Sequence, residues 1–86
     1  MAKDHPAIPV LLQRIKYNIA AALQYLDYQQ YRSAVDAMRV AEESRIEVAF
    51  LLSGDEVSRD ARMLTLLVLE LRLLKEKIKL ATQGRT

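Results

Sequence analysis

The sequence predicts an all-α fold, an antiparallel three-helix bundle, on the basis of three observations. Apolar residues recur at three- and four-residue steps through most of the 86-residue chain, which is the period of an amphipathic helix. The two glycines and two prolines stand at the edges of these periodic segments, at Gly54, Gly84, Pro6 and Pro9. With 51% hydrophobic and 28% charged residues, the composition is that of an ordinary globular protein. We therefore treat residues 1–86 as one helical domain.

The first helix is expected over about residues 9–25. Proline in a first turn loses no hydrogen bond and has a suitable φ, so the segment from Asp4 to Pro9 is typical of a helix entry. Apolar residues then follow one side of a 3.6-residue helix. We expect that side to face the core; its residues are Ile8, Leu11, Leu12, Ile15, Ile19, Ala22 and Leu26.

The next boundary has two interpretations. The segment QYLDYQQY, residues 24–31, contains no glycine or proline, so one unbroken helix from Pro9 to Leu52 is an alternative. Asp27 and Gln30 have the spacing of a capping box, which favours a tight turn and a second helix over about residues 28–52. The stretch DYQQYRSAVDAMRVAEE resembles the turn and second half of a tetratricopeptide hairpin, and this resemblance implies a helical hairpin. One side of the second helix carries mostly small residues, namely Ala34, Ala37, Ala41, Ser44 and Val48.

A third helix is expected over about residues 55–83. Gly54 can end the second helix in a left-handed conformation. Ser53 with Glu56 has capping-box spacing, and Asp55 is another candidate cap. Lysines occupy the last turns, where positive charge complements the helix dipole, and Gly84 is typical of a helix stop.

The run MLTLLVLELRLL, residues 63–74, has nine apolar side chains among twelve. At about 100° per residue, the apolar residues of the third helix divide between two opposite sides. One side suffices to pack against the other helices and comprises Met63, Leu64, Leu67, Leu71, Leu74, Ile78 and Ala81. The opposite side comprises Leu66, Leu69, Leu73 and Leu80. Because a monomer would leave these four leucines exposed, we predict self-association through them, with a homodimer favoured. The alternative is a third helix lying between the first two.

Tyr17, Tyr28 and Arg45 are candidate contact residues for another protein. Both tyrosines lie away from the expected core side of the first helix, and tyrosine is common at interfaces. The alternative is that they are half-buried boundary residues. Arg45 falls at the edge of the apolar side of the second helix, where it either pairs with Glu42 or contacts a partner.

The residue types that carry most enzyme chemistry are scarce. The chain has no cysteine, a single histidine, His5, and no glycine-rich segment that could hold a phosphate. We therefore predict a protein that is not an enzyme, with no catalytic residues, no metal site and no cofactor. The alternative is a small enzyme whose site forms between chains from Arg14, Arg45 and Glu42.

No membrane association is expected. The apolar run of twelve residues is shorter than the roughly 20 that a span needs, and it contains Glu70 and Arg72. The first residues fit neither part of a secretory signal, so we predict a cytoplasmic location.

Charge is unevenly distributed along the chain. Residues 36–60 carry seven acids and three arginines, whereas residues 71–86 carry five basic residues and one glutamate. The basic set, which could contact nucleic-acid phosphates, is Arg72, Lys75, Lys77, Lys79 and Arg85. Its ordinary alternative is a solvated helix end. The sequence therefore favours a non-catalytic interaction module, a small adaptor, regulator or inhibitor of another protein, with nucleic-acid binding as the alternative.

Overall fold

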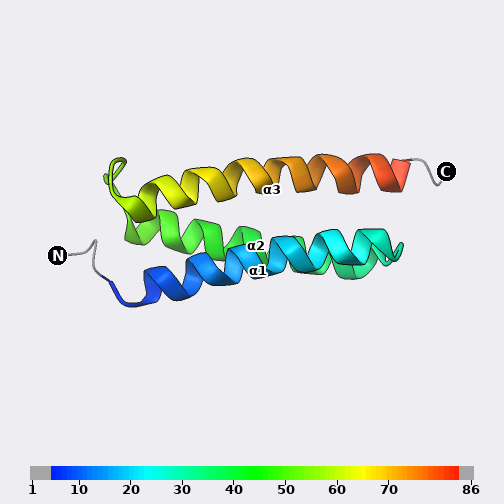
Figure 1. The fold of residues 1–86 in the computed structure, drawn as a ribbon, viewed down its shortest axis with the longest axis horizontal. Helices are drawn as coiled ribbons and strands as arrows, with labels where there is room; N and C mark the ends of the chain where they lie inside the picture. The colour runs from blue at the N-terminus through cyan, green and yellow to red at the C-terminus, as the bar shows by residue number, and fades with distance from the viewer. Residues whose placement is uncertain (1–4, 84–86) are drawn as a thin grey trace.

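The fold is all-helical over residues 5–83, which a computed structural model describes. Helices α1 (Ala7–Asp27), α2 (Tyr31–Leu51) and α3 (Arg59–Gln83) follow one another, and no strand occurs in this range. Successive helices run in opposite directions and pack side by side (Figure 1). The predicted antiparallel three-helix bundle is confirmed. Asp4, Gly84 and Arg85 lie outside the described residues.

A tight turn separates α1 from α2, so the alternative of one unbroken helix is wrong. Gln29 adopts a positive φ of 60°, and the backbone N–H of Gln30 donates to the carbonyl of Tyr25 over 2.8 Å. The expected capping box does not form, because Asp27 is the last residue of α1 and the N-cap of α2 is Gln30, without a side-chain cap bond. Backbone hydrogen bonds in the turn thus replace the cap.

The connection from α2 to α3 is longer than expected, and α3 begins at Arg59 rather than near residue 55. Gly54 has a φ of 82°, as its predicted left-handed role requires. The Asp55 carboxylate accepts hydrogen bonds from the backbone N–H groups of Val57 and Ser58, each over 3.1 Å. The Ser58 hydroxyl then accepts from the N–H of Ala61 over 3.1 Å and caps α3. The Ser53 and Glu56 pair therefore does not cap this helix.

Small side chains let α1 and α2 lie close together. Every member of the predicted small-residue side of α2 is buried, including Ala34 and Ala41 with no exposed surface. The facing side of α1 supplies larger residues, and six of the seven predicted ones are buried: Ile8, Leu11, Leu12, Ile15, Ile19 and Ala22. Leu26 is partly buried against the same core.

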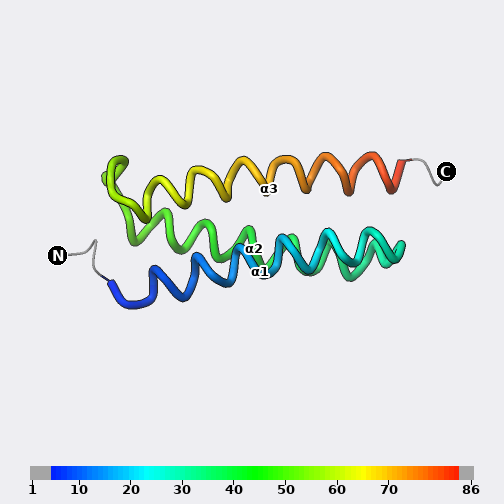
Figure 2. The backbone as a smooth tube through the Cα atoms, in the orientation of Figure 1, coloured from blue at the N-terminus to red at the C-terminus, as the bar shows by residue number. Residues whose placement is uncertain are grey.

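Helix α3 lies along one side of the α1–α2 pair, so the alternative that it runs between them is wrong (Figure 2). Leu67, Leu71, Leu74 and Ile78 fill the core as predicted. Met63, also predicted to be buried, is 38% exposed, because it lies at the edge of a shallow groove beside Pro9 and Leu12 of α1. The molecule is elongated, with extents of 49 × 18 × 15 Å, so α3 presents one long side away from the core.

Candidate interaction surface

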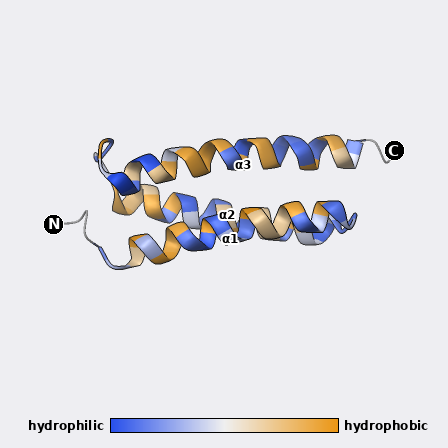
Figure 3. Ribbon diagram, in the orientation of Figure 1, coloured by the Kyte–Doolittle hydropathy of each residue, from blue (hydrophilic) through white to orange (hydrophobic). Residues whose placement is uncertain are grey.

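A line of leucines faces away from the core along α3. Leu66, Leu69, Leu73 and Leu80 are 59%, 49%, 64% and 61% exposed, and we name these four residues the leucine face. Their exposure in a single chain agrees with the helical geometry, since they lie opposite the buried side of α3. Figure 3 shows the resulting alternation of apolar and polar bands along α3. Whether a partner covers the leucine face stays a prediction.

The leucine face continues into a groove between α3 and α1. Leu73 and the fully packed Leu74 line one wall, and Ile19, Ala20 and Leu23 of α1 line the other. The groove has a volume of about 370 Å³, and its lining is mainly apolar. Lys16, Glu70 and Lys77 complete its lining. A partner on the leucine face would thus contact α1 as well as α3.

The other three candidate contact residues do not share one surface. Tyr17, which is 73% exposed, lies beside α2 in a shallow groove that Tyr25 and Val40 also line. Tyr28 is exposed in the turn between α1 and α2. Arg45 lies between α2 and α3. Tyr17, Tyr28 and Arg45 therefore lie on different parts of the molecule, and whether any of them contacts another protein stays a prediction.

Arg45 makes the predicted pair with Glu42. Its Nε donates to Glu42 Oε1 over 2.7 Å, and Lys75 of α3 places its Nζ 2.8 Å from Glu42 Oε2. Partial burial raises the pKa of the Glu42 carboxyl, but hydrogen bonds and positive charge from Lys75 and Arg45 outweigh it, and the pKa lies below its usual value. Glu42 therefore stays ionised and bridges α2 to α3.

A pocket of about 220 Å³ surrounds this carboxylate and is lined by Glu42, Arg45, Val68, Leu71, Arg72 and Lys75. Arg14 is not among the lining residues, so the constellation of Arg14, Arg45 and Glu42 does not form within one chain. Glu42 already pairs with Arg45 and Lys75, two of the three cations that line the pocket. The charged residues of the pocket therefore form an ion-pair network that connects α2 to α3.

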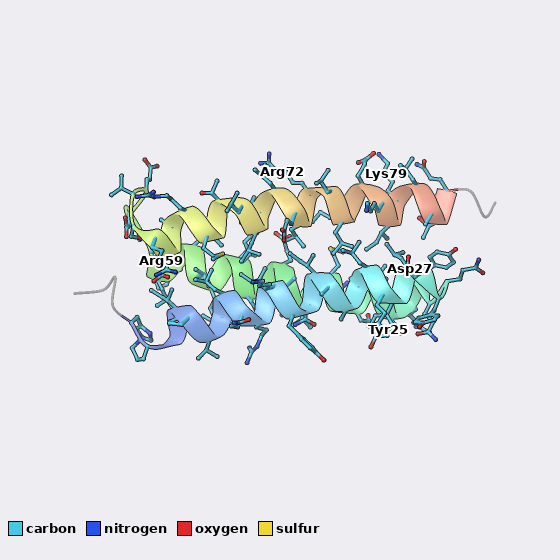
Figure 4. All side chains as sticks on the ribbon, viewed as in Figure 1. Tyr25, Asp27, Arg59, Arg72 and Lys79 are labelled. Atoms are coloured by element: carbon cyan, nitrogen blue, oxygen red, sulfur yellow. The ribbon has the colours of Figure 1, made fainter. Side chains whose placement is uncertain are left out.

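The basic residues near the end of α3 divide between two sides of the helix. Arg72 and Lys75 line the pocket beside α2, whereas Lys77 lines the groove beside α1. Figure 4 shows Arg72 extending from α3 away from the other two helices. Lys79 is exposed. Arg72, Lys75 and Lys79 stand at steps of three and four residues and so share one side of α3, whereas Lys77 lies on another. Whether these cations contact nucleic acid stays a prediction.

Ile46 and Phe50 form an exposed apolar pair on α2 that was not predicted from the sequence. They are 56% and 79% exposed and stand four residues apart, so they share one side of the helix. Val57 in the next connection is 75% exposed. The signal was present in the sequence, because both residues lie opposite the small-residue side of α2.

Comparison of the chain with protein family models, with curated proteins and with solved structures finds no match. Between residues 5 and 83, no three acidic, histidine or cysteine side chains gather as metal ligands. Over the same range, no helix combines the length and the apolar content that crossing a membrane demands.

Proposed function

We propose that this protein is a non-catalytic protein–protein interaction module, a small adaptor, regulator or inhibitor that acts as a homo-oligomer, with a dimer as its basic form. The observation that carries the proposal is the leucine face, in which four large apolar side chains on one side of α3 are each about half exposed or more. Contiguous apolar patches of this kind are uncommon on monomers and mark contact surfaces. We also propose the cytoplasm as its location.

Energetic considerations support the same surface. Burying a leucine stabilises a protein by roughly 1.5–3 kcal/mol relative to leaving it exposed. Even partial burial of four leucines from each of two chains is therefore a large contribution for a short chain, whose folding stability is expected to be about 5–10 kcal/mol. Association would convert the exposed side of α3 into a second core.

Nucleic-acid binding is the second candidate, and the exposed cations near the end of α3 support it. Lys75 is already paired with Glu42, and Lys77 lies on the opposite side from Arg72, so fewer cations can reach one phosphate backbone. Titration with single-stranded and duplex oligonucleotides at two salt concentrations tests this candidate. Affinity that falls steeply with salt supports it, and no binding at low salt overturns it.

Light scattering on the parent chain and on the variant L69E/L73E tests the proposed function. We expect the parent to have an oligomeric mass and the variant to have a monomeric one, because each glutamate would have to be desolvated in the contact. The variant I46E/F50E is the matched control, since it places two glutamates on an exposed apolar pair of α2. A parent that stays monomeric at high concentration contradicts the proposal, as does an equal loss of mass in both variants.

A further inference from the structure

We infer that the occupant of the leucine face is a second copy of this chain, with its α3 running antiparallel to the first. The inference rests on the proposed function and adds the identity and direction of the partner. It depends on the order of charged and apolar residues along the exposed side of α3, and on the charges at the two ends of the molecule.

The leucine face belongs to a longer line with heptad spacing. Arg62 stands four residues before Leu66. Glu76 stands three residues after Leu73 and four before Leu80. Such alternating steps of three and four residues keep side chains on one side of a helix. Both charged residues are exposed. The order along the line is Arg62, Leu66, Leu69, Leu73, Glu76, Leu80. It therefore has a cation at one end and an anion near the other.

This order is self-complementary only when two copies run in opposite directions. Arg62 stands seven positions before Leu69, and Glu76 stands seven positions after it. If Leu69 lies near the two-fold axis, Arg62 of each chain therefore lies opposite Glu76 of its partner. A parallel pair in register would instead place Arg62 against Arg62 and Glu76 against Glu76, and like charges facing each other across a contact are costly. The Nε of Arg62 donates to the Val57 carbonyl over 3.2 Å, which occupies one of the five guanidinium N–H groups and leaves others for a carboxylate.

Charges beyond the line favour the same direction. The start of α3 and the connection before it carry Asp55, Glu56 and Asp60 against Arg59 and Arg62. The second half of α3 carries four cations, Arg72, Lys75, Lys77 and Lys79, against Glu76. An antiparallel pair places the basic half of each α3 beside the more acidic end of its partner, and a parallel pair places the two basic halves together.

The groove between α1 and α3 extends the contact to a second helix. Leu73 belongs to the leucine face and also lines this groove opposite Leu23, which is 36% exposed. A partner α3 lying on Leu73 therefore approaches α1 too. Two copies related by a two-fold axis would form a layer of four helices, α1 and α3 from each chain, with apolar side chains on both sides of the contact.

A charge exchange between Arg62 and Glu76 tests the direction. We expect R62E to weaken the dimer about tenfold, because two pairs of glutamates then face each other across the axis. The exchanged variant R62E/E76R should recover the parent affinity to within about threefold. R32E, the same charge change at an exposed position at the start of α2, is the matched control and should leave the dissociation constant unchanged. Sedimentation equilibrium gives the constants, and circular dichroism checks that each variant keeps its helices.

Disulfide trapping gives a direct readout, because the chain contains no cysteine of its own. A disulfide needs Cα atoms within about 7 Å. We expect a mixture of R62C and E76C to yield the mixed disulfide on mild oxidation. Each variant alone should stay uncoupled, since two copies of the same position lie roughly 21 Å apart along the antiparallel axis.

The outcomes separate the two proposals. A mixed disulfide together with recovery in the exchanged variant supports the antiparallel pair. A dimer that couples R62C to itself, or that yields no disulfide in any combination, overturns the antiparallel pair and leaves the proposed function standing. A parent chain that is monomeric overturns the proposed function and this inference with it.

Discussion

Lys75 Nζ of α3 lies 2.8 Å from Glu42 Oε2 of α2, and this ion pair joins two helices that no disulfide links. The other oxygen of the same carboxylate accepts a hydrogen bond from Arg45 Nε on its own helix. Glu42 thus has a partner on each side. Because only about a quarter of its side-chain surface is exposed, its charge is less screened than that of an isolated surface glutamate.

Replacing this carboxylate should weaken the attachment of α3. We expect E42Q to lower the free energy of unfolding by about 1 kcal/mol, a value kept small because Lys75 is half exposed and partly screened by water. Urea unfolding followed by circular dichroism measures the change. E43Q, on the exposed neighbouring residue, is the control and should stay within about 0.5 kcal/mol of the parent.

A double-mutant cycle assigns the effect to the pair. If Glu42 and Lys75 interact, the losses in E42Q and K75M should not add, and the double variant should lose less than their sum. Additive losses would show that the 2.8 Å contact contributes nothing measurable to stability.

The lowered pKa of Glu42 predicts a specific dependence of stability on pH. A carboxylate whose pKa is lower in the folded than in the unfolded chain stabilises the fold fully above its ordinary, unfolded pKa of 4.5. That contribution disappears as the pH falls through the lower folded pKa. The difference in unfolding free energy between the parent and E42Q should therefore be constant above about pH 5 and shrink below pH 4. Urea midpoints at pH 3, 4, 5 and 7 test this, and a difference that grows in acid would contradict it.

The apolar periodicity of the sequence predicted most of the residues that pack, although Met63 is more exposed than expected. The small-residue side of α2 is buried in full, because its five residues at helical spacing form one continuous side on which α1 packs. The same geometry identified the exposed leucines and the pairing of Arg45 with Glu42. Lys75 as the second partner of Glu42 could not be predicted, since the rotation of α3 against α2 depends on the packing of all three helices.

The helix boundaries were harder to predict than the core. Serine, aspartate and asparagine cap helices from several positions, and the connection around Gly54 offers Ser53, Asp55 and Ser58 within six residues. Which of these residues caps α3 depends on the length of connection that α3 needs in order to pack against the other helices. Asp55 orders the connection by accepting hydrogen bonds from two backbone N–H groups, and Ser58, three residues after Asp55, caps α3. A local pattern alone could not distinguish these roles.

Substitution of the two serines separates the observed cap from the one expected. We expect S58A to destabilise the protein by about 1 kcal/mol, because the N–H of Ala61 loses its hydroxyl acceptor at the start of α3. S53A removes an exposed hydroxyl on the other side of Gly54 and should change the unfolding free energy by less than about 0.5 kcal/mol. Thermal and urea unfolding of both variants measure the difference. Equal losses in the two variants would mean that Ser58 does not cap α3.

The close approach of α1 and α2 predicts that enlarging the small-residue side of α2 is more damaging than the same enlargement on its exposed side. Ala41 has no exposed surface, so a leucine there must displace α1 or adopt a strained rotamer, and we expect A41L to cost about 1–3 kcal/mol. A49L makes the same change at an exposed position of α2, and leucine and alanine both favour helices, so it should cost less than about 0.5 kcal/mol. The two urea midpoints provide the comparison. If A41L were as stable as A49L, the helices would have room to separate, and the small residues would not be what sets their spacing.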